Sequence, residues 1–180
     1  ISVHPGEAKD IMVNAALIAC EIAMKLPKRE IPAHTEDREG FFHLTDMSGD
    51  VVSAKLSYIV RDHDKNLFES RLNKLRALEV EMNQKYGANT VNLNISHSYE
   101  NMLSVIENNM YVVDLAKDAI FAAGLEPVSS PVRGGTDGAR LSYEGLPCPN
   151  LFTGGENFHG RFEYIPVEDM ESCTQVLIRL

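Results

Sequence analysis

The chain has 180 residues, 44% of them hydrophobic, and a formal net charge of −9. This size allows one large or two small domains with real cores, and the negative charge argues against a nucleic-acid partner. No apolar run reaches the length of a membrane span, and the three scattered cysteines predict neither a disulfide framework nor a cysteine zinc knuckle. The composition therefore favours a cytoplasmic protein with reduced cysteines.

Residues 1–102 have the pattern of an α+β domain. The spacing of apolar residues predicts helices and strands in the order strand, helix, strand, strand, helix, strand. The predicted ranges are 1–3, 10–25, 41–44, 51–61, 65–86 and 91–96, with a turn at 47–50. Asp64 is the expected N-cap of the second helix, and Gly87 ends it. This order predicts a four-stranded antiparallel sheet with two helices on one face.

A polar stretch at residues 97–109 marks a domain boundary, which we set at 102/103. After it, the apolar spacing predicts a helix at residues 111–123, with Gly124 as its C-cap. A final helix at residues 166–179 would turn Met170, Cys173 and Leu177 toward the core. Two buried strands, at residues 131–132 and 151–152, and a short helix are expected between these helices, which is typical of the edge of an α/β domain. These residues are too few to enclose such a domain.

The chain opens with ISVHPG, and Ile1 to Val3 have the character of a strand end. We therefore expect a truncated first strand, and a chain that is the C-terminal portion of a longer protein.

The glycine-rich stretch at residues 131–160 is the first candidate for a site, because glycines allow close approach to a ligand. His159 is either a surface histidine or a metal ligand. Arg133 is either a solvated charge, or the partner of Asp137 in an ion pair, or the anchor for a substrate carboxylate. Asp137 suits a metal ligand, a general base or a loop cap, and the cap is favoured.

His4 lies beside a turn, and on residues alone it is best explained as a partly exposed turn histidine. The other four histidines have no ligand-like spacing. The chain also lacks the H-E-x-x-H, G-x-S-x-G, P-loop and G-x-G-x-x-G motifs. A catalytic metal usually has three protein ligands, so the visible residues do not form a full catalytic set.

Three segments carry a family resemblance: VHPGEAKDIMVNAA, PVRGGTDGARLSYEGLPCPNLFTGG and NFHGRFEYIP. They resemble the dinuclear zinc exopeptidase family, which also holds acetylornithine deacetylase, carnosinase-type dipeptidases and the glutamate carboxypeptidases. GGTD followed by a G-x-x-x-H loop recurs in that family. The longer RGGTDGA and GLPCPNLFTGG segments are similar to its aminotripeptidase branch, and the resemblance extends over the whole chain.

The resemblance implies a lid or dimerisation domain at residues 1–102 and the last part of a zinc-binding catalytic domain at residues 103–180. It implies a cytoplasmic homodimer joined through the lids and two zinc ions in each active site of the full-length enzyme. The implied site roles are catalysis by His4, metal binding by His159 and substrate binding by Arg133, Asn101, Gly135 and Thr136. His4 would polarise the scissile carbonyl in the partner subunit.

The expected activity is release of the N-terminal residue from tripeptides by the full-length protein. The family's other metal ligands and its general base match nothing in this chain, so we expect the chain alone to be inactive. Two alternatives stay open: a non-catalytic lid and dimerisation module, and a dipeptidase or deacylase of the same family.

Overall fold

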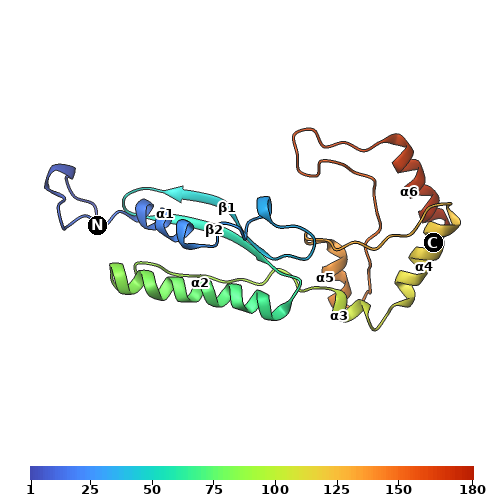
Figure 1. Cartoon of the computed structure of the whole chain (residues 1–180), viewed down its shortest axis with the longest axis horizontal. Helices are drawn as coiled ribbons and strands as arrows, with labels where there is room; N and C mark the ends of the chain where they lie inside the picture. The colour runs from blue at the N-terminus through green and yellow to red at the C-terminus, as the bar shows by residue number, and fades with distance from the viewer. The chain divides into compact units, whose positions relative to one another are not determined.

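The computed structural model describes residues 1–180 and divides into two compact units, Ile1–Ser96 and His97–Leu180. The chain has a two-stranded antiparallel sheet and six α-helices, which confirms the predicted α+β class (Figure 1). The division between the units falls at the start of the polar stretch that the sequence indicated as a boundary. No helix combines the length and the hydropathy that crossing a membrane would require.

The first unit consists of a β-hairpin with two long helices. Its elements are the 3-10 helix η1 (Pro5–Glu7), helix α1 (Ala15–Lys25), the 3-10 helix η2 (Pro32–His34), strands β1 (Phe41–Gly49) and β2 (Ala54–Arg61), and helix α2 (Lys65–Tyr86). The helix α2 begins and ends as predicted. The Asp64 carboxylate accepts hydrogen bonds from the amides of Asn66 and Leu67. Gly87 ends the helix with a φ of 109°.

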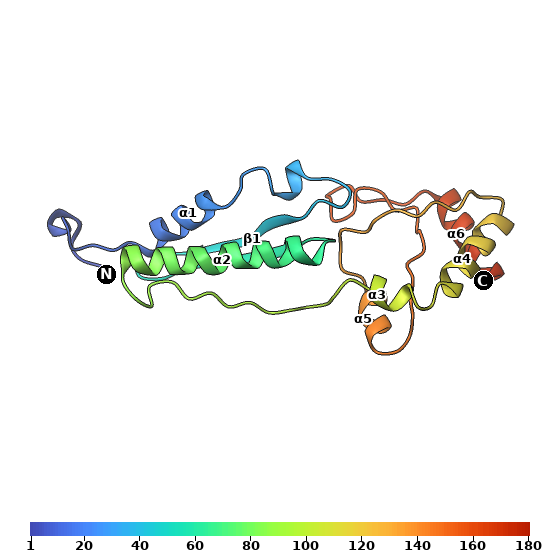
Figure 2. The same ribbon diagram turned by 60° about the horizontal axis from the view of Figure 1, so that its bottom comes forward.

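Both helices pack on one face of the hairpin (Figure 2). The core joins Leu26, which follows α1, to Phe42 of β1 and to Leu78 and Met82 of α2. Tyr58 and Val60 of β2 pack against this core, as their predicted alternation required. The hydrophobic spacing therefore identified the buried face of the hairpin correctly.

The hairpin turn lies three residues later than predicted. The strand β1 continues through Gly49, and the turn is closed by Asp50, whose carboxylate accepts the amides of Val52 and Ser53 at 2.7 and 3.0 Å. These bonds hold the pKa of Asp50 below its ordinary value. The glycine in residues 47–50 suggested the position of the turn. The Asp50 side chain decides where the turn closes, because it bonds the backbone amides two and three residues further on.

The helix α1 begins at Ala15 rather than at the predicted residue 10. Asn14 is its N-cap and accepts the amide of Leu17 at 3.3 Å. The hairpin turn supplies two further acceptors, because the carbonyls of Asp50 and Val51 accept the first two amides of the helix. The apolar spacing upstream of Asn14 does not extend the helix, since these caps fix its first turn.

The structure corrects the prediction of four strands, since only the two hairpin strands form a ladder. Residues 91–96 alternate in burial as a strand would but have no ladder partner. In the split βαβ order the last strand pairs with the first. Residues 1–3 form no strand here, so residues 91–96 have no first strand to pair with. Side chains of α2 bind this backbone instead: Asn83 bonds both the amide and the carbonyl of Val91 at 2.9 Å.

The second unit has four helices, α3 (Leu103–Ile106), α4 (Tyr111–Ala122), α5 (Asp137–Tyr143) and α6 (Val167–Arg179). The helix α3 contacts α5, and α4 contacts α6 (Figure 1). The helix α4 ends one residue before the predicted end: its C-cap is Ala123, and Gly124 follows with a φ of 84°.

The predicted core face of α6 is correct at Cys173, which is half-buried, and wrong at Leu177 and Met170, which are 56% and 42% exposed. Val176 is the fully buried residue of this helix. The helix contacts α4, and Arg179 donates to the carbonyl of Ala122 at 3.1 Å. The predicted strands at residues 131–132 and 151–152 are also absent, and the predicted short helix between them is α5.

Candidate functional site

His4 is the predicted catalytic residue in the first unit, and it caps η1. Its Nδ1 atom accepts the amide of Gly6 at 3.1 Å, and the residue is exposed. A neutral imidazole that accepts at Nδ1 carries its proton on Nε2. The turn therefore orients the ring and leaves Nε2–H as a hydrogen-bond donor toward solvent or a ligand.

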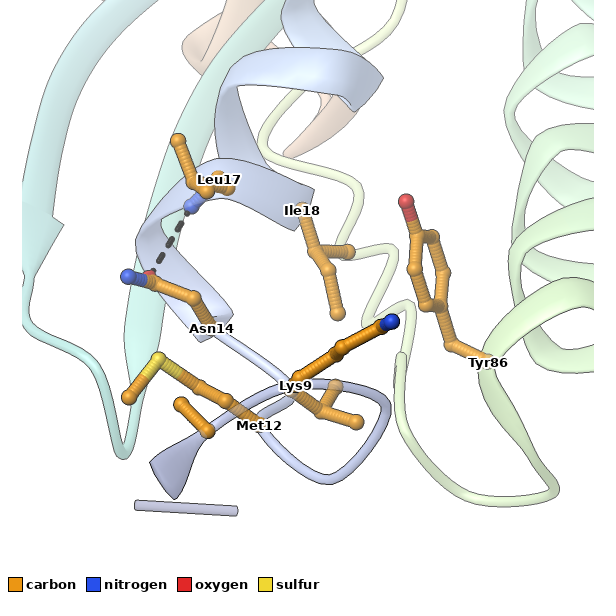
Figure 3. A pocket seen from close by; sticks show the side chains of 8 residues that line it. Lys9, Met12, Asn14, Leu17, Ile18 and Tyr86 are labelled. Atoms are coloured by element: carbon orange, nitrogen blue, oxygen red, sulfur yellow. Dashed lines mark hydrogen bonds between the residues drawn. The ribbon is translucent and has the colours of Figure 1, made fainter. Parts of the chain in front are cut away.

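An open apolar pocket of about 450 Å³ lies near the start of α1 (Figure 3). In the close view, the Lys9 side chain extends beside the ring of Tyr86. The pocket is lined by Ala8, Lys9, Met12, Val13, Asn14, Leu17, Ile18 and Tyr86. None of the predicted site residues lines it, so it is not the site that the motifs indicated.

In the second unit, the GGTD turn leads directly into α5. Thr136 is the N-cap of this helix and accepts the amide of Ala139 at 3.4 Å. Asp137 is the first residue of the helix, where a carboxylate suits the positive end of the helix dipole. The cap of this helix is therefore Thr136, whereas the loop cap that we favoured from the sequence was the next residue, Asp137.

Close backbone contacts fix α5 against the segment that follows it. A Cβ atom on Gly138 would lie 2.6 Å from the carbonyl oxygen of Cys148, so only glycine fits there. Ser142 is buried and bonds the carbonyl of Gly138 at 2.7 Å while accepting the amide of Cys148 at 3.0 Å. The GLPCPN segment is therefore held beside the turn.

Asn101 and Gly135, both predicted to bind substrate, lie in segments that the structure brings together. A Cβ atom on Gly135 would lie 2.4 Å from the ring of Tyr99, so the glycine backbone packs on that ring. The hydroxyl of Tyr143, at the end of α5, donates to the carbonyl of Asn101 at 2.8 Å. The Asn101 side chain itself accepts the amide of Leu103, the first residue of α3, at 3.0 Å.

Tyr99 and Tyr143 were missed by the sequence reasoning. Each contacts a residue more than thirty positions away, and no local spacing signals such a pair. Arg133 is half-buried, with its Nε atom shielded from solvent. Its burial distinguishes it from an ordinary solvated surface arginine such as Arg140, whose side chain is 80% exposed.

His159 lies in a loop that the bridge between Glu156 and Tyr164 closes. The residue is exposed and has a φ of 62°. Its backbone amide donates to the Glu163 carboxylate at 2.9 Å. The imidazole is therefore carried by a hydrogen-bonded turn and is open to a ligand.

The chain's residues do not fit a complete metal site. No group of three or more His, Cys, Asp or Glu side chains is arranged to hold a metal ion. An exposed imidazole such as that of His159 fits a single ligand, but a catalytic metal needs at least three protein ligands. We therefore derive no catalytic step through a metal from these residues.

Comparison with known proteins defines the class. The family model of the M20/M25/M40 peptidases matches residues 5–180, so the chain belongs to peptidase family M20/M25/M40. This confirms the family resemblance of its motifs, and members of this family are generally metal-dependent. The match includes the GGTD turn, α5 and the His159 loop.

Among individual proteins, the chain is similar to those named Peptidase T. It is 50% identical to Peptidase T of Parabacteroides distasonis over 180 residues and 51% identical to that of Halothermothrix orenii over 180 residues. In both cases the match covers 100% of this chain and 44% of the relative. The chain thus spans less than half the length of these relatives.

Two solved structures share its fold. A tripeptidase from Staphylococcus aureus matches with a TM-score of 0.70 and 17% identity, over 98% of this chain and 47% of that one. The aminopeptidase PepT from Bacillus cereus matches with a TM-score of 0.63 and 20% identity, over the same shares of the two chains.

Proposed function

We propose that the whole protein is a tripeptide aminopeptidase that releases the N-terminal residue of its substrate. The observation that carries this proposal is the identity of about half of all positions with proteins named Peptidase T, across the full chain. That similarity includes the segments of His4, Arg133 and His159. The likeness to a tripeptidase and an aminopeptidase among solved structures supports the fold.

In this proposal His4 polarises the scissile carbonyl. Its Nδ1 atom is occupied by the Gly6 amide, so the neutral ring offers Nε2–H as the donor. A donor aimed at the developing oxyanion contributes more in the transition state than in the ground state. The turn Pro5–Glu7 would keep this donor oriented before substrate arrives.

Arg133 is proposed to bind the C-terminal carboxylate of the tripeptide and so to select substrate length. A planar guanidinium makes two parallel bonds to a carboxylate, and partial burial strengthens them by limiting competition from water. Gly135 and Thr136 would shape the pocket wall beside it. Asn101 would contact the substrate from the segment that Tyr143 fastens to α5.

The test compares kcat/KM of the whole protein for a tripeptide and for its C-terminally amidated form. The wild type should prefer the free carboxylate, and Arg133→Ala should lose about 10²-fold on the tripeptide and little on the amide. Arg140→Ala is the matched control, because that arginine is exposed and paired with Glu144 at 3.1 Å. Equal loss on both substrates, or on neither, would remove Arg133 from the role of carboxylate anchor.

The same assay separates the other activities. Cleavage of dipeptides but not tripeptides would indicate a dipeptidase, and cleavage of N-acyl substrates a deacylase. If the whole protein cleaves none of these, a non-catalytic lid and dimerisation module becomes the better description.

We also propose zinc as the metal, with His159 as one ligand and the other ligands outside this chain. The metal would supply Lewis-acid activation of the carbonyl and of water. The three cysteines are free thiols, which suits the reducing cytoplasm where we place the protein.

A homodimer is part of the proposal. Residues 1–102 would form the lid and dimerisation domain, and residues 103–180 the last part of the catalytic domain. The open edge of the hairpin sheet would pair with a second copy. The hairpin has exposed apolar side chains, such as Met47, which is 44% exposed. A second copy would cover such side chains in a dimer. Light scattering of the whole protein should give twice the monomer mass.

A further inference from the structure

The loop that carries His159 is closed on itself by its backbone. Glu156 and Tyr164 exchange two hydrogen bonds, at 2.8 and 3.2 Å. Inside this closure, the amide of Gly160 donates to the carbonyl of Asn157 at 2.7 Å. The loop therefore has a defined path, although every residue of 156–164 is exposed.

Within this loop, His159 has a backbone conformation that residues with a Cβ atom rarely adopt. Its φ is 62°, in the left-handed region. Such a conformation persists only where the surrounding contacts hold it. The contact at this residue is the bond from its amide to the Oε2 atom of Glu163, at 2.9 Å.

Glu163 is well placed to hold that conformation. It lies on the returning arm of the loop, and its own amide donates to the carbonyl of Gly160 at 3.2 Å. An ionised carboxylate accepts a stronger hydrogen bond from a backbone amide than a neutral group does. Because the rotamers open to a side chain depend on its φ and ψ, fixing the His159 backbone also restricts the directions in which its imidazole can point.

We propose that Glu163 is a positioning residue that fixes the direction of the His159 imidazole. Glu163 acts through the backbone of His159 and needs no contact with substrate. The inference rests on the proposed function, in which that imidazole is a site residue. It adds to that function a carboxylate that the motif itself does not identify.

The experiment uses the whole protein and three variants: Glu163→Ala, Glu163→Gln and Glu156→Ala. The first measurement is hydrogen exchange of the His159 amide without substrate. Glu163→Ala should raise its exchange rate about tenfold or more, the effect of losing a bond to a charged acceptor. Glu163→Gln keeps an acceptor oxygen and should stay closer to wild type. Glu156→Ala removes an equal charge from the same loop and should leave this amide unchanged.

The second measurement is tripeptide cleavage by the same proteins. Glu163→Ala should lower kcat about tenfold with KM little changed, and Glu163→Gln should restore most of it, because a misdirected imidazole affects the reacting geometry rather than substrate binding. Unchanged exchange in Glu163→Ala, or faster exchange with wild-type kcat, would overturn the proposal. If the wild type cleaves no tripeptide, the proposed function fails separately, and exchange still decides whether Glu163 holds His159.

Discussion

The Nζ atom of Lys85 on α2 lies 2.7 Å from the Oε1 atom of Glu21 on α1. The Tyr86 hydroxyl donates to the same carboxylate, so Glu21 is bonded by two consecutive residues of α2. These bonds lower the pKa of Glu21 below its ordinary 4.5 and raise that of Lys85 above its ordinary 10.5. The pair therefore links the two helices of the first unit in a pH-dependent way.

We expect this link to stabilise the protein only between two pH limits. A carboxyl with a lowered pKa contributes stability fully above about pH 4.5, and loses it as the pH falls through its folded pKa. A lysine with a raised pKa contributes fully below about pH 10.5, and loses it as the pH rises through its folded pKa.

The measurement is the free energy of unfolding of wild type and Glu21→Gln from pH 3 to pH 11, on the order of one point per unit. The difference in the free energy of unfolding between wild type and Glu21→Gln should be constant at intermediate pH. It should shrink at the acidic and at the basic end of the range. A double-mutant cycle with Lys85→Met isolates the interaction of the pair. The free-energy cost of Glu21→Gln should be smaller when Lys85 is already replaced, because the interaction is then absent. A difference that does not vary with pH would mean that Glu21 acts by packing instead.

Arg71 and Asp62 form a second link, inside the first unit. The Asp62 side chain is 2% exposed and the Arg71 side chain 14% exposed, and Arg71 also bonds the carbonyl of Gly40 at 3.2 Å. Asp62→Ala removes the more buried of the two carboxylate partners of this guanidinium and leaves Glu30 at 3.2 Å, so it should cost about 3 kcal/mol of unfolding free energy.

The control for that prediction lies on the same helix. Arg76 pairs with Glu69 at 3.8 Å, and both side chains are about half exposed. Arg76→Ala should cost no more than about 1 kcal/mol, because water screens an exposed pair. Similar costs for the two substitutions, measured by denaturant unfolding, would contradict the difference in burial.

Met82 is fully buried in the core between α2 and the hairpin. Met82→Ala removes its packing and leaves a cavity, at a cost of about 2–5 kcal/mol. Val80 lies on the same helix but is 55% exposed, so Val80→Ala should change stability by less than about 0.5 kcal/mol. Thermal unfolding of both variants measures the contrast, and a Met82→Ala variant as stable as Val80→Ala would place the core elsewhere.

Gly135→Ala should disturb the GGTD turn, because the added methyl would overlap the ring of Tyr99. We expect a higher KM for tripeptides in the whole protein. Tyr99→Ala combined with Gly135→Ala removes the overlap and should recover part of the loss. If the double variant is no better than the single one, the cause lies in the backbone of residue 135 and not in the ring.

The sequence predicted best where the cause is local. The helix α2 was predicted to within a residue, because Asp64 and Gly87 fix its ends through bonds to residues four or fewer positions away. The cap of α5 was predicted one residue too late, at Asp137, although the bond that Thr136 makes lies within the same turn. The family was evident from the glycine-rich motif and the His159 loop.

The prediction failed where a distant partner decides. Residues 91–96 have the alternation of a strand, but a ladder needs a second strand, and here Asn83 of α2 bonds their backbone instead. The face of α6 was misjudged at Leu177, which is exposed, while Val176 is buried and the helix packs against the distant α4.

The amino-acid sequence alone determined the family of this protein, its α+β class and both ends of α2, since motifs and caps act over a few residues. Only the tertiary structure decided that the ring of Tyr99 lies on Gly135 and that Tyr143 holds Asn101. Such pairs depend on how the chain brings distant segments together, and no spacing within either segment encodes that contact.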